Sequence, residues 1–438
     1  MAAFRLTTLM LLLVATAATG DEPRRPNSPT RSVSLKPTSQ AADQDAWPQW
    51  RGINRDGISL ETDLLSEWPE GGPKLVWSNS GLGMGYSGPS VRDDRLFILG
   101  TADDKTACMG LDIKSNKILW TTPIGEIYVN GWGDGPRSTP TIDGDKVYAL
   151  SGEGNLNCLS AVDGKVVWTK SLVEDFGGSI PKWGYSESPL VDGDVIYCTP
   201  GGTNFMVALD KKSGETIWKS TGFDTGAQYS SIIKATVGKV TMGLTMSKEG
   251  LVAINLEDGK YLWNFEKTAN SVAVIPTPVF HDNYVYSTSG YGTGSGLVKV
   301  VPKGSTVEDE EVYFNKVMKN HHGGVVLWQG HIYGHSDKVG WICQDFLTGE
   351  LVWRERNALS KGSIAYADGN LYCYGQEEGK CFLVEASPEG WKPRGNFEIP
   401  IKTSFDRKKG RIWTHPVIAD GKLYLRDQEH LFCYDIRK

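Results

Sequence analysis

The chain has 438 residues, and its 46 Lys and Arg against 52 Asp and Glu give a formal net charge of −6. An acidic chain without a long basic run is not expected to bind nucleic acid. Its 51 glycines and 15 tryptophans indicate tight turns and packing aromatics that repeat along the chain.

Residues 1–20 have the layout of a secretory signal peptide, because Arg5 precedes an apolar run that ends at Ala18 and small residues follow. The run is too short to span a bilayer. Residues 21–45 are rich in Pro, Ser, Thr and charge, which predicts a disordered linker. We therefore expect an exported protein, periplasmic or extracellular, with no membrane anchor after cleavage and with residues 46–438 as the folded domain.

The segment from Trp47 to Ser59 precedes the first expected strand. Its residues Trp47, Trp50 and Arg51 predict a plug that packs against the rest of the domain, while Asn54–Gly57 forms a turn.

Residues 137–168 define the structural unit of the domain. Three short apolar runs of β-rich composition are separated by Asp-Gly turns and a Gly-containing link, and a fourth run ends on Trp168. This pattern predicts four short antiparallel strands. One such sheet cannot bury both of its faces, so it must stack on others.

A glycine four residues before a tryptophan recurs along the chain. The marks are Gly164–Trp168, Gly214–Trp218, Gly259–Trp263 and Gly349–Trp353, with Asn116–Trp120 as a variant and with Trp77, Tyr313 and Phe397 at the matching places of the other units. A period of roughly 45 residues with four strands per unit predicts an all-β protein, an eight-bladed β-propeller of four-stranded antiparallel blades.

The two ends of the repeat region predict how the ring closes. Lys74–Trp77 is a single strand without a blade, whereas His415–Asp435 supplies three strands and lacks a fourth. We therefore expect the N-terminal strand to join the C-terminal blade by pairing with Leu431–Tyr434, which leaves no open sheet edge.

Seven cysteines occur in the chain. Most of them occupy positions expected in the core of a blade, where cysteine acts as a small apolar residue. Only Cys373 and Cys381 flank one hairpin closely enough to form a bridge, and the sequence leaves that disulfide open.

The run Ala208-Leu209-Asp210, followed by Gly214 and Trp218, resembles the tryptophan-docking repeat of the PQQ-like β-propellers, and the likeness covers about residues 73–438. That superfamily includes quinoprotein alcohol dehydrogenases and the propeller lipoprotein of the outer-membrane β-barrel assembly machinery. The resemblance therefore implies the fold, and it implies either an enzyme that uses PQQ with Ca²⁺ or a protein that only binds.

The positions where the innermost strands begin line the central channel of a propeller near one mouth. Alignment of the blades places eight residues there, namely Tyr86, Arg137, Ser186, Tyr229, Ile275, His322, Lys361 and Trp413. We expect the same mouth to hold Trp183, Tyr185, His321, His415 and the acids Glu187 and Asp134. Cations beside aromatic planes suit a planar or sugar-like anionic ligand. The alternative is that these residues only satisfy one another across the channel.

His321 and His322 invite a metal interpretation, but adjacent side chains of an extended strand point to opposite faces. A mononuclear site needs three or four converging ligands. We therefore expect no metal here.

Two main functions follow. The first is a monomeric exported binding or scaffold module, whose channel mouth and loops dock a protein, peptide or glycan. The second, implied by the resemblance, is a PQQ- and Ca²⁺-dependent alcohol or sugar dehydrogenase. In it Trp183 or Trp413 stacks on the cofactor, Arg137 and Lys361 meet its carboxylates, and Glu187 or Asp134 is the catalytic acid.

A third and more distant possibility is a glycosidase with Glu187 and Asp134 as its carboxylate pair. We favour the first, because eight blades use nearly all residues after Trp77 and leave none to cap an active site.

Overall fold

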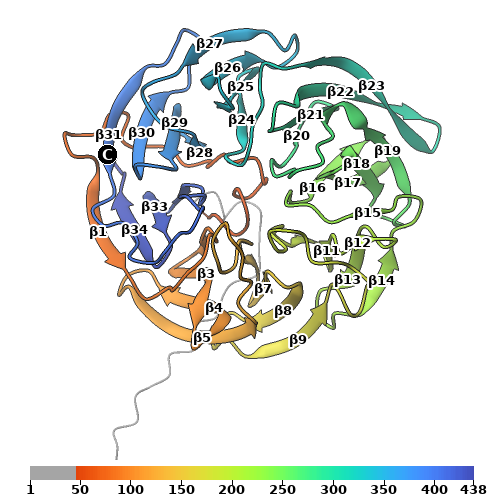
Figure 1. Cartoon of the computed structure of the whole chain (residues 1–438), viewed down its shortest axis with the longest axis horizontal. Helices are drawn as coiled ribbons and strands as arrows, with labels where there is room; N and C mark the ends of the chain where they lie inside the picture. The colour runs from red at the N-terminus through yellow and green to blue at the C-terminus, as the bar shows by residue number, and fades with distance from the viewer. Residues whose placement is uncertain (1–45) are drawn as a thin grey trace, which may run out of the picture. The chain divides into compact units, whose positions relative to one another are not determined.

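The short β-rich runs of the sequence form strands that pair with their neighbours along the chain, except where the ring closes. In the computed structural model, which describes residues 46–438, these strands build eight four-stranded antiparallel sheets around a central channel (Figure 1). The predicted all-β eight-bladed propeller is confirmed.

Each blade runs from an innermost to an outermost strand. Blades 1 to 4 consist of β2 (Ser90–Arg92), β3 (Arg95–Ala102), β4 (Lys105–Asp112) and β5 (Lys117–Gly125); β6 (Thr141–Asp143), β7 (Lys146–Leu150), β8 (Asn155–Ser160) and β9 (Val166–Ser171); β10 (Leu190–Asp192), β11 (Val195–Cys198), β13 (Val207–Asp210) and β14 (Thr216–Lys219); and β16 (Ile233–Val237), β17 (Val240–Ser247), β18 (Gly250–Asn255) and β19 (Tyr261–Phe265).

The remaining blades follow the same order. Blades 5 to 8 consist of β20 (Val279–His281), β21 (Tyr284–Ser289), β22 (Gly294–Lys303) and β23 (Thr306–Asn315); β24 (Val325–Trp328), β25 (His331–Ser336), β26 (Gly340–Asp345) and β27 (Leu351–Glu355); β28 (Gly362–Ala367), β29 (Asn370–Gly375), β30 (Lys380–Glu385) and β31 (Pro393–Glu398); and β32 (Val417–Ala419), β33 (Lys422–Asp427), β34 (His430–Asp435) and β1 (Lys74–Asn79). A two-stranded sheet, β12 (Gly201–Gly202) with β15 (Thr225–Gly226), and the 3₁₀ helix η1 (Glu266–Thr268) complete the described elements.

The ring closes through the N-terminal strand. Strand β1 pairs antiparallel with β34, with Lys74 opposite Asp435 and Asn79 opposite Leu431, and the two strands lie side by side in Figure 1 (orange and blue). Blade 8 therefore takes its outer strand from one end of the propeller sequence and its three inner strands from the other. The predicted pairing is confirmed, and it couples the two ends of the ring without a covalent bond.

The glycine and tryptophan of the repeat pack against each other between neighbouring blades. A Cβ placed on Gly214 would lie 2.9 Å from the indole of Trp168, which belongs to the preceding blade. The indole Nε1 of Trp168 also donates a hydrogen bond to the Lys211 carbonyl at 3.1 Å. The same docking links Trp120 to Gly164. Four blades thus offer a glycine turn, at Gly164, Gly214, Gly259 and Gly349, on which an aromatic ring of the preceding blade rests.

The segment after Trp47 closes the channel as a plug, as the sequence predicts (Figure 1). Trp47 exchanges backbone hydrogen bonds with Val91 of blade 1. Arg51 donates to the carbonyl of Val325 in blade 6, and Arg55 donates to both carbonyls that directly precede β10 of blade 3. Burial lowers the pKa of each guanidinium to about 10, so both stay charged at neutral pH.

All seven cysteines lie in the described part of the chain, and all are buried and free. In the hairpin of β29 and β30, Cys373 is opposite Phe382 and Cys381 is opposite Tyr374. A shift of one residue puts the two thiols on opposite faces of the sheet, which excludes a bridge between them.

The expected signal peptide and linker, residues 1–20 and 21–45, lie outside the described residues. Within residues 46–438 no helix has the length and apolar character that crossing a bilayer requires.

The docking of tryptophan on glycine predicts a measurable difference between two glycine substitutions. Gly193 and Gly214 both have positive φ angles, of 59° and 72°, but only Gly214 faces an indole, whereas the space around Gly193 is open. We expect Gly193→Ala to lower the free energy of unfolding by about 1 kcal/mol, the cost of a left-handed alanine, and Gly214→Ala by roughly 3 kcal/mol because overpacking adds to it. Equal losses in denaturant titrations of the two variants would contradict the docking account.

Candidate functional site: an aromatic cavity at the channel mouth

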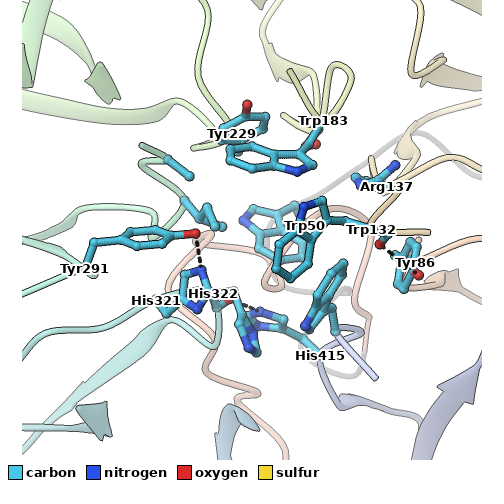
Figure 2. Close-up of a pocket in the computed structure, with 14 residues that line it drawn as sticks. Trp50, Tyr86, Trp132, Arg137, Trp183, Tyr229, Tyr291, His321, His322 and His415 are labelled. Carbon is cyan, nitrogen blue, oxygen red and sulfur yellow. Dashed lines mark hydrogen bonds between the residues drawn. The ribbon is translucent and has the colours of Figure 1, made fainter. Parts of the chain in front are cut away.

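A cavity of about 240 Å³ opens at one mouth of the channel (Figure 2). Most of its lining is aromatic. The fourteen lining residues are Trp50, Tyr86, Trp132, Arg137, Trp183, Ser186, Tyr229, Ala273, Ile275, Tyr291, His321, His322, Trp413 and His415. Figure 2 shows Trp183 with Tyr229 on one side, Tyr291 with His321 on another, and Trp50 between them.

The repeat itself positions much of this lining. In seven blades one lining residue lies four positions before the first residue of the innermost strand, as Tyr86 does before Ser90 and Arg137 before Thr141. The same offset holds for Ser186, Tyr229, Ile275, His321 and Trp413. The chain enters each inner strand from the same mouth, so a fixed offset brings one side chain per blade to the cavity wall.

Eight of the ten residues predicted to bind a ligand line this cavity: Tyr86, Arg137, Trp183, Tyr229, His321, His322, Trp413 and His415. The other two lie elsewhere. Tyr185 is buried among apolar side chains of blades 2 and 3 and donates its hydroxyl to the Pro200 carbonyl at 2.9 Å. Lys361 lies behind His321 and forms an ion pair with Asp337 at 2.6 Å.

Four other lining residues did not stand out as ligand-binding in the sequence. Trp50 comes from the plug, Trp132 from the long loop before Arg137, and Tyr291 from a glycine-rich hairpin. Ala273 is too small to attract notice. An aromatic residue in a long loop next to a predicted mouth position was the signal that would have identified Trp132, and the predicted plug was the signal for Trp50.

The two candidate catalytic acids do not meet in the cavity. Glu187 is buried and accepts a hydrogen bond from the Thr199 amide, and burial raises its pKa to about 7. Asp134 forms an ion pair with Lys408 at 2.8 Å. Neither acid is among the described residues that line the cavity, so Glu187 and Asp134 do not form a carboxylate pair there.

A chain of hydrogen bonds fixes the proton positions on one wall. Lys361 Nζ lies 3.1 Å from His321 Nδ1, and His321 Nε2 lies 2.8 Å from the Tyr291 hydroxyl. An ammonium group can only donate, so Nδ1 accepts, Nε2 carries the proton and the tyrosine oxygen accepts it. The Tyr291 hydroxyl proton is then available to an acceptor in the cavity. Burial, with a smaller contribution from the nearby charge of Lys361, lowers the pKa of His321 to about 4.

His322 and His415 each commit one ring nitrogen to the protein. Nε2 of His322 lies 2.8 Å from the Gln376 side-chain oxygen, and Nε2 of His415 lies 3.0 Å from the backbone carbonyl of His322. Both partners are acceptors, so both Nε2 atoms carry the proton. The Nδ1 atoms of the two rings are buried and have no partner, and each therefore keeps an acceptor lone pair.

Arg137 is the permanent cation among the described lining residues, none of which is a carboxylate. Its guanidinium lies 5.1 Å from the ring centre of Tyr86 and donates to the carbonyls of Gly133 and Gly135 at 2.8 and 3.0 Å. Burial lowers the pKa of Arg137. The fold thus holds one positive charge at the edge of an apolar, aromatic cavity.

The fold and the repeat define a class of protein, and the comparisons agree. Residues 111–355, more than half of the chain, match the family model PQQ_2, described as outer membrane protein assembly factor BamB. The chain belongs to this family of PQQ-like β-propellers.

Its relatives have different functions. Tetrathionate hydrolase of Acidithiobacillus ferrooxidans is 24% identical over 301 residues, which cover 65% of this chain and 49% of the hydrolase. BamB of Shewanella oneidensis is 21% identical over 355 residues, which cover 71% of this chain and 86% of that protein. This chain thus spans about half the length of the hydrolase.

Two solved structures share the fold. BamB from Moraxella catarrhalis has a TM-score of 0.56 at 13% identity, covering 82% of this chain and 97% of that one. Quinohemoprotein alcohol dehydrogenase from Comamonas testosteroni has a TM-score of 0.63 at 12% identity, covering 91% and 82%. At these identities the likeness shows the fold alone.

The lining does not fit PQQ with Ca²⁺. A calcium ion takes six to eight oxygen ligands, largely from carboxylates and carbonyls, and the described lining residues offer no side-chain carboxylate or carboxamide. No three or more His, Cys, Asp or Glu residues within residues 46–438 are grouped so that they could hold a metal.

The buried imidazoles predict a fold that loses stability in acid. The pKa values of His321 and His335 are lowered to about 4, that of His415 to about 3 and that of His322 well below its ordinary value, chiefly by burial. Below about pH 6.5 the unfolded chain therefore binds more protons than the folded chain, and stability falls by about 1.4 kcal/mol per pH unit for each imidazole. Glu187 has the opposite effect on stability and offsets about one imidazole, because its pKa in the folded chain, about 7, lies above the ordinary value of 4.5.

The measurement is the free energy of unfolding from guanidinium titrations between pH 7.5 and 5. We expect the free energy of unfolding to fall as the pH is lowered. In His415→Gln the slope of this dependence should be smaller by the contribution of about one proton. A flat profile, or an unchanged slope in the variant, would contradict the neutral state of these rings.

Proposed function

We propose that this chain is a binding module that works outside the cytoplasm, and that the cavity at its channel mouth receives the ligand. The observation that carries the proposal is the lining itself: seven tryptophan and tyrosine rings, one guanidinium and no carboxylate around about 240 Å³. Concave, largely apolar sites with a few fixed polar groups are where proteins bind small ligands or groups of larger ones.

The polar groups of the cavity favour a ligand over mutual satisfaction across the channel. Residues that only satisfied one another would leave few groups unpaired, because burying an unpaired polar atom costs free energy. Here the Tyr291 hydroxyl and the guanidinium of Arg137 keep hydrogens for which the described residues provide no acceptor. Trp132 and Tyr291 also keep 43% and 47% of their surfaces exposed beside the cavity, which is costly for large aromatic side chains without a ligand.

Export and a macromolecular partner are part of the proposal. The signal-like residues 1–20 and the relatives named for outer-membrane protein assembly support a location beyond the inner membrane and a protein or peptide partner at the loops around the mouth. A glycan is a further candidate ligand, because indole rings stack on sugars, and we expect the protein to act as a monomer.

A quinoprotein dehydrogenase is the second candidate, because solved dehydrogenases share the fold over most of this chain. The described lining lacks the oxygen ligands for calcium, and Glu187 and Asp134 lie away from it. We therefore include PQQ with Ca²⁺ as a probe in the binding experiment below.

The test of the proposed function is a ligand screen with a variant whose cavity is filled. Ser186 lines the cavity, so Ser186→Leu reduces its volume, whereas Ser305→Leu makes the same change in an exposed position on the hairpin between β22 and β23. We expect at least one compound of a diverse library to raise the melting temperature of the native protein and of Ser305→Leu but not that of Ser186→Leu, and we expect PQQ with Ca²⁺ to have no effect.

Stabilisation that is equal in the two variants would place binding outside the cavity. Tight binding of PQQ that requires Ca²⁺ would overturn the binding module in favour of the enzyme.

A further inference from the structure

The walls of the cavity set the shape of its occupant. The rings of Trp183 and Tyr229 lie 5.6 Å apart between centres and are tilted by 58°, and those of Tyr86 and Trp413 lie 5.1 Å apart and are tilted by 34°. Two tilted aromatic pairs thus line the wall, and Figure 2 shows Trp183 with Tyr229 as one of them. Their separations are those of packed aromatic pairs. Individual indole and phenol rings in the wall favour an aromatic ligand, which can stack on one ring and meet another edge-on.

The volume sets its size. A cavity of about 150 Å³ lined by apolar side chains holds one benzene ring. The present cavity of about 240 Å³ is larger by more than half, which corresponds to a body of two fused rings.

The charges set its ionic state. Arg137 is the permanent cation among the described lining residues, Lys361 behind the wall is neutralised by Asp337, and the imidazoles are neutral. This arrangement attracts one negative charge and repels cations. Each terminal nitrogen of Arg137 carries two hydrogens and gives one to a backbone carbonyl, so each keeps a second for an oxygen of a carboxylate.

The remaining polar atoms set its substituents. The Tyr291 hydroxyl accepts from His321 and offers its own proton to the cavity, whereas the Nδ1 atoms of His322 and His415 are shielded from it. A ligand that uses this donor carries an oxygen acceptor, such as a hydroxyl, besides its anion.

We propose that the cavity binds a small aromatic molecule of two fused rings that carries a single carboxylate and a hydroxyl group. The proposal rests on the proposed function and names the chemical class of its ligand. It differs from PQQ in charge and in metal, because one guanidinium matches one carboxylate and the lining provides no calcium ligands.

The test uses 6-hydroxy-2-naphthoate as the probe, titrated calorimetrically into the purified full-length protein. The comparison compounds are 6-hydroxy-2-naphthamide, which lacks the charge, 2-naphthoate, which lacks the hydroxyl, naphthalene-2,6-dicarboxylate, which adds a charge, and glucuronate, a sugar anion without a ring system. We expect the first compound to bind best, the amide and the dicarboxylate at least tenfold more weakly, 2-naphthoate severalfold more weakly, and glucuronate not measurably.

Three variants identify the residues. Arg137→Gln should weaken the acid about tenfold while the amide keeps its affinity, which also shows that the cavity is intact. Tyr291→Phe should remove the advantage of the hydroxyl compound over 2-naphthoate. Arg394→Gln changes an exposed arginine on the outer strand β31 and should alter no affinity.

Equal affinity for the acid and the amide, an unchanged affinity in Arg137→Gln, or binding of glucuronate at the same site would each overturn the proposed ligand class. If the naphthyl compounds fail while a library compound of another class binds in a manner that Ser186→Leu abolishes, the ligand class is wrong and the binding function stands. If no compound of any class binds in the cavity, both proposals fall.

Discussion

The packing of an indole on a glycine turn holds the ring together, because no blade can bury both faces of its sheet alone. Trp168 rests on Gly214, and its ring nitrogen donates to the carbonyl of Lys211 in the next blade. Repetition of this contact sets the distance and angle between neighbouring blades. Closure then depends on one non-covalent pairing, between β1 and β34, so the first strand of the propeller stabilises the last blade.

The site follows from this repetition. Since the blades repeat one arrangement of strands, residues at one offset from seven of the inner strands converge at one mouth, and the sequence differs there from blade to blade. The plug adds a central side chain that the blades do not supply. Trp50 lies in the centre of the channel, and its indole N–H donates a hydrogen bond to the Thr277 hydroxyl at 3.0 Å. A scaffold built from identical units thus carries a wall of individual residues, which is why relatives of one fold include a hydrolase, dehydrogenases and assembly factors.

The period of the repeat made the fold predictable, including the pairing of the two ends. The same alignment located Tyr86, Arg137, Tyr229 and Trp413, because their position depends only on the offset within a blade. The alignment wrongly placed Lys361 at the cavity. Strand β28 begins at Gly362, directly after Lys361, whereas each other inner strand begins four residues after the residue that lines the cavity. Trp132 and Tyr291 reach the cavity through loops, and loop conformation depends on tertiary contacts that no period encodes.

The sequence could not predict which imidazole nitrogens lack a hydrogen-bond partner, because partners such as Gln376 come from a neighbouring blade. The guanidinium, the Tyr291 hydroxyl and the aromatic lining are the reason to regard the mouth as a binding site and not as packing.

The most direct test of a ligand-binding cavity is a crystal structure of the protein soaked with 6-hydroxy-2-naphthoate. The account predicts density for the naphthyl body inside the cavity, in contact with its aromatic lining, with its carboxylate against Arg137. Density only at the surface, or a cavity that the lining side chains fill by pairing with one another, would contradict it.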